Sequence, residues 1–260
     1  MKNISFWTLS FALILVSGCG DEELTSSWRQ TEITIDGNQS DWESKLHYLS
    51  DQQSVVGIAN DNEYLYLCLA TNDTAKMFQF FSTGFTVWLE SKNSDEKIGV
   101  QYPMRSGDMR RMMPMRNRQN EGERPDMKVR LNEFKAQQSE IGIVNKDNFP
   151  LTVYPLTNEL GLNVDLGVQM GLLVYEMKIP LDKDLYGGHN LKSGPGDVLT
   201  IGFESGDFQR PNISDSGERP SGMEMGRRGG GRQGVGNRGL PNAPTMQKID
   251  FEIEARLASK

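Results

Sequence analysis

The chain is poor in cysteine and histidine, which removes two common routes to a stabilised or reactive site. Only two cysteines occur among 260 residues. If Cys19 is modified as argued below, Cys68 has no partner within the chain and no internal disulfide can form. Cys68 lies in an apolar strand pattern, where a small buried thiol is expected. His47 and His189 are far apart in expected loops, so a histidine-based metal or catalytic centre is not expected.

Motifs for covalent or metal-assisted catalysis are also missing. The sequence holds no G-x-S-x-G, no H-E-x-x-H and no paired cysteine and histidine. Carboxylates are numerous, and two of them suffice for glycoside hydrolysis, but their spacing in sequence does not show that any two face each other. We therefore expect a protein that is not an enzyme and has no resident cofactor.

Basic charge is scarce except in two stretches. Lys and Arg number 28 against 35 Asp and Glu, for a net charge of −7, which argues against nucleic acid as a partner. Residues 104–126 hold six arginines and four acids (6 − 4 = +2), and residues 209–246 hold six arginines and three acids (6 − 3 = +3). Neither stretch has strand or helix periodicity. Both are predicted to be long disordered loops inserted between strands.

One long apolar run is present, from Ile4 to Val16. It is too short to span a bilayer, which takes about 20 apolar residues. A preceding Lys2 and the small residues Ser17 and Gly18 complete the pattern of a secretion signal over residues 1–18. We expect this segment to be removed on export.

The residues at the expected cleavage point, Val16-Ser17-Gly18-Cys19, resemble the bacterial lipobox. This resemblance implies an acylated Cys19 and membrane lipid as a partner, and several acyl chains hold a protein where one does not. An ordinary signal peptide is the alternative. The following Gly20-Asp21-Glu22-Glu23 is similar to the surface-export tag of Bacteroidota lipoproteins, or is simply an acidic tether. The expected location is the cell envelope, at the outer membrane and with surface exposure left open.

Alternation of apolar and polar residues predicts an all-β protein: a single antiparallel β-sandwich, jelly-roll-like, over residues 31–254. A lipidated tether over 19–30 precedes it and a tail over 255–260 follows. One helix is expected from Thr74 to Thr83, with Thr74 as its N-cap. The predicted strands are 31–36, 54–59, 64–70, 85–90, 97–102, 140–144, 151–154, 161–166, 172–179, 198–204 and 248–254.

The same alternation separates a core face from an outer face on each strand. One side of each pattern is apolar and is assigned to the space between the two sheets. The expected core residues are Leu65, Leu67, Leu69, Phe85, Val87, Leu89, Tyr175, Met177, Ile179, Leu199, Ile201, Phe203, Ile249, Phe251 and Ile253.

Several short islands resemble family 9 carbohydrate-binding modules and the related DOMON-type sandwiches. They are Ile33–Gly37 followed by Asp41-Trp42, Asn60–Leu67, Gly84–Leu89, and Tyr175–Leu181 followed by Gly194–Phe203. The resemblance implies the sandwich fold, with Trp42 plugging one end of the core. Family 9 modules grip sugars between aromatic rings, a pair that cannot be placed in this sequence. Related sandwiches bind haem through Met with His or Lys, and no such pairing stands out here.

Trp88 is the main candidate for ligand binding. It falls on the polar face of its strand, where a flat ring can stack on a sugar. Glu90, Glu176, Glu204 and Glu252 are expected to share that face and to accept hydrogen bonds from sugar hydroxyls. The alternative is that Trp88 is covered by other parts of the chain and forms a small second core.

The two arginine-rich stretches offer further candidates. Thioethers select Cu(I), and one flexible loop holds Met109, Met112, Met113 and Met115, although its six arginines would repel a cation. Both stretches suit contact with an anionic surface, such as polysaccharide or lipid headgroups, or with an acidic envelope protein; each is otherwise a solvated linker. Three functions therefore remain open: a non-catalytic module that binds a ligand such as a glycan, an assembly lipoprotein, and a copper or haem binder.

Overall fold

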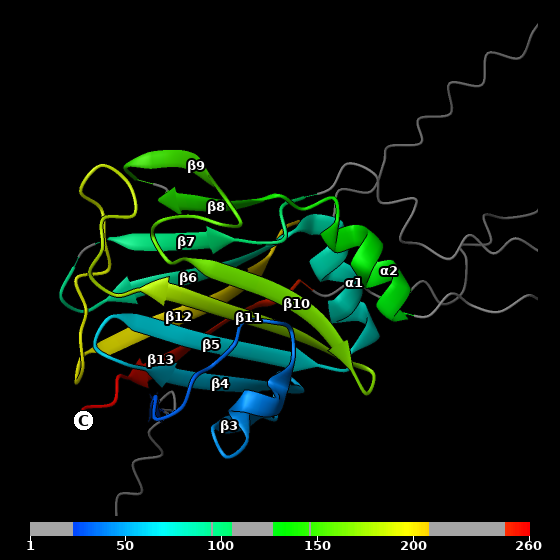
Figure 1. Cartoon of the computed structure of the whole chain (residues 1–260), viewed down its shortest axis with the longest axis horizontal. Helices are drawn as coiled ribbons and strands as arrows, with labels where there is room; N and C mark the ends of the chain where they lie inside the picture. The colour runs from blue at the N-terminus through cyan, green and yellow to red at the C-terminus, as the bar shows by residue number, and fades with distance from the viewer. Residues whose placement is uncertain (1–22, 95, 106–126, 146, 208–247) are drawn as a thin grey trace, which may run out of the picture.

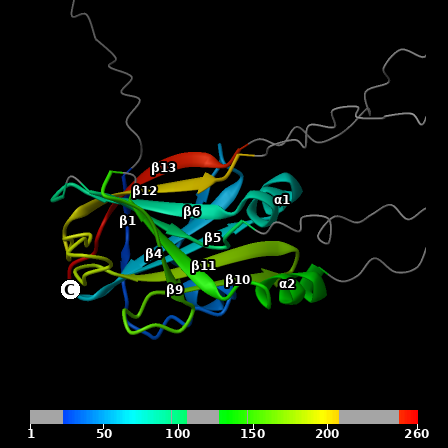
Figure 2. The same ribbon diagram turned by 90° about the horizontal axis from the view of Figure 1, so that it is seen from above.

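Two β-sheets pack face to face in this chain (Figures 1 and 2). The computed structural model describes residues 23–94, 96–105, 127–145, 147–207 and 248–260. The seven-stranded sheet contains, in spatial order, β1 (Leu24–Thr25), β13 (Asp250–Arg256), β12 (Val198–Ser205), β6 (Phe85–Ser91), β7 (Lys97–Gln101), β8 (Glu140–Asn145) and β9 (Phe149–Pro155). The six-stranded sheet contains β10 (Asn163–Gln169), β11 (Leu172–Pro180), β5 (Tyr64–Thr71), β4 (Ser54–Asn60) and β2 (Ser27–Trp28), with β3 (Leu46–Leu49) also pairing with β4.

The predicted sandwich and its core faces are confirmed. All pairings among the strands β4 to β13 are antiparallel. The predicted core residues are buried between the sheets, except that Phe251 is only partly buried against the cluster. Aromatic rings fill the centre, where Phe85 meets Tyr175 edge-on with ring centroids 5.2 Å apart. Cys68 is a free, buried thiol, as expected, and burial raises its pKa.

Two helices close one end of the sandwich (Figure 1). The predicted helix is present as α1 (Thr74–Thr83), but its N-cap is Asp73, whose carboxylate accepts from two backbone N–H groups. The predicted cap was therefore displaced by one residue. A second helix, α2 (Met127–Lys135), was not predicted. It is joined to β10 by an ion pair in which Lys135 Nζ lies 2.6 Å from Asp165 Oδ1.

The N-terminal part of the fold differs from the prediction. Residues 24–25 and 27–28, expected in a tether over 19–30, form strands β1 and β2, which pair parallel with β13 and β4. Trp28 is therefore part of the six-stranded sheet. The predicted strand over 31–36 is absent, because this segment crosses the outer face of the sheet instead of pairing with an edge.

That crossing segment builds a second, smaller core. Trp42 is fully buried against Gly57 on the outer face of the six-stranded sheet, so the prediction that it plugs an end of the main core was wrong. A Cβ on Gly57 would lie 2.6 Å from the Trp42 ring, which explains the glycine in mid-strand. The other buried members of this core are Ile33, Ala59, Tyr66, Cys68, Ala70 and Val174.

Asp61 connects the turn between β4 and β5 to Arg29, which directly follows β2. Its carboxylate accepts from the backbone N–H groups of Glu63 and Tyr64, both at 2.8 Å, and lies 2.7 Å from Arg29 Nε. Burial disfavours the charged carboxylate, but these hydrogen bonds and Arg29 outweigh it and lower the pKa of Asp61. The turn is thereby stabilised in the ionised form.

The two arginine-rich stretches fall between β7 and α2 and between β12 and β13. Apart from Met104 and Arg105, both stretches lie outside the described residues, as does the segment 1–22 with Cys19. Among the helices that the structure describes, none is long and apolar enough to cross a membrane.

Candidate functional site

The outer face of the seven-stranded sheet carries the predicted tryptophan and most of its predicted neighbours. Strand register places Gly202 on β12 between Trp88 on β6 and Glu252 on β13, and it places Gly99 on the far side of Trp88. One glycine therefore flanks Trp88 on each side. Glycine weakens a strand and often marks a place where another group approaches closely.

Trp88 is not an exposed platform. Only 6% of its surface is accessible. Its ring covers Gly99, where an added Cβ would lie 2.8 Å from a ring carbon, and its indole N–H donates to Glu204 Oε2 at 2.6 Å. The covered alternative raised from the sequence describes this position better than an open stacking surface does, because the ring is buried against Gly99 of the neighbouring strand.

A slot opens above Gly202, on the other side of Trp88. It has a volume of about 230 Å³. Gly202 forms its floor, since no side chain rises from that position, and Trp88 forms one wall. The rest of the lining consists of four charged residues and two aromatic ones: Lys97, Glu204, Asp250, Glu252, Phe203 and Phe251.

An ion pair spans the slot. Lys97 on β7 and Glu252 on β13 are separated by two strands, which is about 14 Å at the ~4.8 Å spacing of neighbouring strands. Their side chains nevertheless meet, with Lys97 Nζ 2.7 Å from Glu252 Oε1. Both side chains are substantially exposed, so the pair contributes little to stability. A ligand can therefore displace it at small cost.

Lys248 organises the other end of the slot. Its Nζ lies 2.8 Å from Glu204 Oε1 and 3.4 Å from Asp250 Oδ2. The hydrogen bond that Lys248 donates to Glu204 raises the pKa of Lys248, and the nearby carboxylate charges act in the same direction. Glu204 is thus held between an indole N–H and an ammonium, which fixes its oxygens beside the slot.

Glu90 shares this outer face, opposite Thr200 and Lys97, but Glu176 does not. The prediction that Glu176 belongs with Trp88 was wrong, because β11 lies in the other sheet. Glu176 is fully buried beneath the segment that carries Trp42 and accepts four hydrogen bonds there. Alternation along a strand assigns a face within one sheet, but it does not say which sheet the strand joins.

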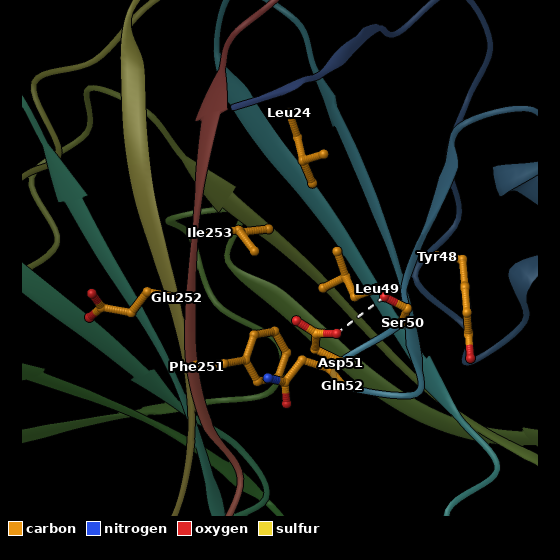
Figure 3. A pocket seen from close by; sticks show the side chains of 9 residues that line it. All are labelled: Leu24, Tyr48, Leu49, Ser50, Asp51, Gln52, Phe251, Glu252 and Ile253. Carbon is orange, nitrogen blue, oxygen red and sulfur yellow. Dashed lines mark hydrogen bonds between the residues drawn. The ribbon is translucent and has the colours of Figure 1, made fainter. Parts of the chain in front are cut away.

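A second hollow, of about 310 Å³, lies at the open side of the sandwich (Figure 3). Leu24, Leu49, Phe251 and Ile253 form its apolar floor, and the turn from Ser50 to Gln52 forms its polar side. In Figure 3 Phe251 and Ile253 point from β13 toward this turn, while Glu252 points to the opposite side of the strand. Phe251 and Glu252 border both hollows.

The described residues do not include the predicted methionine site. Met109, Met112, Met113 and Met115 lie outside the described residues, so the Cu(I) hypothesis stays a prediction. Within the described part of the chain, no group of three or more His, Cys, Asp or Glu side chains is placed to hold a metal ion. His189 instead pairs with Glu96, with Nδ1 2.8 Å from Oε1.

Sequence reasoning missed Lys97, Lys248, Asp250 and the floor glycine as parts of the slot. The usable signal was the glycines: Gly99 and Gly202 each interrupt a strand pattern on the polar face. The charged residues gave no signal, since their convergence depends on strand order across β7, β6, β12 and β13.

Comparison with known proteins gives a coarse likeness of fold. No protein-family model and no curated protein matches the chain. A family 9 carbohydrate-binding module from Caldicellulosiruptor kristjanssonii, solved with cellotriose, is 12% identical with a TM-score of 0.34; the match covers 71% of this chain and 76% of that one. A Bacteroides uniformis protein, classed provisionally as carbohydrate-binding, is 8% identical with a TM-score of 0.36, over 72% and 84% of the two chains.

Proposed function

We propose that this protein is a non-catalytic binding module held at a membrane by lipid on Cys19, and that it binds a saccharide in the slot above Gly202. The observation that carries the proposal is the slot itself. A glycine floor and a tryptophan wall adjoin fixed carboxylate and ammonium groups. Small-molecule sites combine an apolar surface with a few convergent polar groups in this way.

The charges around the slot favour an uncharged sugar. Six carboxylates, those of Glu90, Glu204, Asp207, Asp250, Glu252 and Glu254, lie near three ammonium groups from the lysines at 92, 97 and 248. The net local charge is therefore −3 (3 − 6). Sugar hydroxyls donate readily to carboxylates, whereas a uronic acid or sulfated sugar would meet like charge. We expect neutral oligosaccharides to bind better than anionic ones.

The test is titration calorimetry of the mature protein against neutral and uronic-acid-containing oligosaccharides. Gly202→Val would fill the floor of the slot, and steric changes of this size alter binding by about 10–200-fold. The matched control is Gly194→Ala, where an added Cβ meets nothing within 4 Å. We expect the first variant to lose neutral-sugar binding and the control to keep it. Equal affinity of wild type and Gly202→Val for the same sugar would refute the slot.

The anchor is the second part of the proposal, and it rests on the lipobox-like sequence. The fold begins at Leu24 rather than after residue 30, so only residues 19–23 would link the lipid to the sandwich. Five extended residues reach about 17 Å, which would keep the sandwich close to the membrane surface. Mass spectrometry of the protein from its native host should find an acylated Cys19 at the N-terminus; an unmodified cysteine or a retained signal would contradict this.

A further inference from the structure

Strand β13 has an open edge along most of its length. On one side it pairs with β12 from Asp250 to Arg256. On the other side, within the described residues, its partner is β1, which pairs only with Ala255 and Arg256. The edge from residue 250 to 254 is therefore without a strand neighbour in the described structure.

The hydrogen bonds identify which backbone groups face that edge. Ile249 O accepts from Ser205 N at 2.9 Å and Leu257 N donates to Asp197 O at 2.8 Å, so the odd-numbered residues face β12. Successive residues of a strand direct their N–H and C=O groups to opposite edges. The groups of Asp250, Glu252 and Glu254 therefore face outward, as does Arg256 O, which accepts from Ser26 N of the N-terminal segment at 2.9 Å.

The two sides of this edge have opposite chemistry. The inward side opens on the 310 Å³ hollow (Figure 3), which we call the apolar cleft. Its floor of Leu24, Leu49, Phe251 and Ile253 is continuous with the main core. The outward side carries the carboxylates of Asp250, Glu252 and Glu254, which form exposed ion pairs with Lys248, Lys97 and Lys92. Exposed pairs of this kind contribute little to stability, so incoming basic groups can replace or share them. A strand added here would alternate between an apolar environment and an acidic one.

Strand β1 shows how a segment occupies this edge. Leu24 lies opposite Ala255, is buried in the core cluster, and is followed by Thr25 on the exposed side. The sequence before Leu24 does not suit the rest of the edge. Continuing the same register would set Glu22 opposite Ile253, on the apolar side, and Asp21 opposite Glu252, beside a like charge.

We propose that the β13 edge is a docking site for an extended segment of another protein in which apolar residues alternate with Lys or Arg. The segment adds as a strand beside β13 and continues the line of β1. Its apolar side chains enter the cleft between β13 and the turn that follows β3, and its basic side chains pair with the carboxylates of Asp250, Glu252 and Glu254. Main-chain hydrogen bonds provide affinity in this mode, and the alternating side chains provide selectivity.

The probe is a labelled seven-residue synthetic peptide that alternates Val with Lys, with blocked ends, titrated into the full mature protein at moderate salt. Two versions carry N-methyl groups on alternate residues, one on the odd and one on the even positions. Only one set of peptide N–H groups faces β13, so we expect one version to lose binding at least tenfold and the other to bind like the parent. A peptide that alternates Val with Glu is the charge control and should not bind.

Two variants of the protein test the residues of the proposed docking site. Leu49→Asp places a charge in the apolar cleft without touching the β12–β13 ladder, and Glu254→Lys reverses one outward charge. Each variant should lower the affinity for the parent peptide at least tenfold, while thermal unfolding shows that the fold persists. Lys45→Glu, in the turn that precedes β3, is the control and should leave the affinity unchanged.

Three results would overturn the proposal. Equal binding of both N-methylated peptides would show charge attraction without strand pairing. Binding that appears only after residues 209–246 are deleted would show that the chain's own segment fills the edge. A dimer in sedimentation experiments that Leu49→Asp dissociates would assign the edge to a second copy. None of these results depends on sugar binding, which Gly202→Val tests at a different position.

Discussion

The hydrogen bonds of Glu176 make the strongest prediction about stability. This fully buried carboxylate accepts the backbone N–H groups of Asp36, Gly37 and Asn38 through Oε2, at 3.0, 2.7 and 3.2 Å. Its Oε1 accepts the indole N–H of Trp42 at 2.6 Å. Burial raises the pKa of Glu176, while these hydrogen bonds act against the increase. The carboxylate thus joins the crossing segment to β11 at two points.

Glu176→Gln keeps the shape but replaces one acceptor oxygen by an NH2 group that faces a donor. The amide can satisfy either the three backbone N–H groups or the indole, but not both. Losing a charge-assisted hydrogen bond and leaving a buried donor without an acceptor costs about 3 kcal/mol together. For a domain of this size we expect the melting temperature to fall by about 6–12 °C.

Thermal unfolding followed by circular dichroism is the assay, with Glu204→Gln as the matched control. Glu204 also accepts an indole N–H but is partly exposed, so this change should lower stability by less than about 1 kcal/mol. Trp42→Phe should cost less in the Glu176→Gln background than in wild type, because it removes the donor that the amide cannot serve. A melting temperature within about 2 °C of wild type for Glu176→Gln, or strict additivity with Trp42→Phe, would show that the Glu176 hydrogen bonds do not stabilise the fold in this way.

Three further predictions concern the second core and its turn. The folded state lowers the pKa of Asp61, so its ionisation stabilises the fold at neutral pH, and the stability difference between wild type and Asp61→Asn should shrink as pH falls below about 4. Cys68, measured in a Cys19→Ser chain, should resist a thiol reagent at pH 8 until guanidinium unfolds the protein; rapid labelling of the native chain would show that the thiol is accessible. Gly57→Ala should cost about 1–3 kcal/mol in denaturant unfolding because its Cβ would overlap the Trp42 ring, and an unchanged midpoint would contradict that contact.

The strands of the sandwich could be predicted because one residue pattern decides them. In β5, Leu65, Leu67 and Leu69 alternate with Tyr66 and Cys68, so the leucines enter the main core and the other two side chains enter the second core. The N-terminal segment could not be predicted in the same way. Residues 31–36 also alternate, but they lie across a sheet and contribute side chains to a second core without joining a ladder.

The candidate site was only partly accessible from the sequence. Trp88 and Glu204 were placed on one face correctly, because each lies on the polar side of its own strand. Lys97 and Lys248 reach this site only because β7, β6, β12 and β13 are neighbours in the sheet. Strands that pair across many intervening residues leave no local pattern in the sequence that would predict the pairing. The burial of Trp88 depends on a glycine in the adjacent strand, which a pattern within one strand does not reveal.

Binding of a neutral saccharide in the slot above Gly202 can be measured by titrating the mature protein with a panel of neutral oligosaccharides. Amide chemical shifts recorded during the titration would locate the ligand. We predict saturable changes at Trp88, Lys97 and Gly202, including the Trp88 indole N–H, and their loss in Gly202→Val. Saturable binding whose shift changes avoid β6, β12 and β13, or no binding by any neutral sugar in the panel, would contradict this prediction.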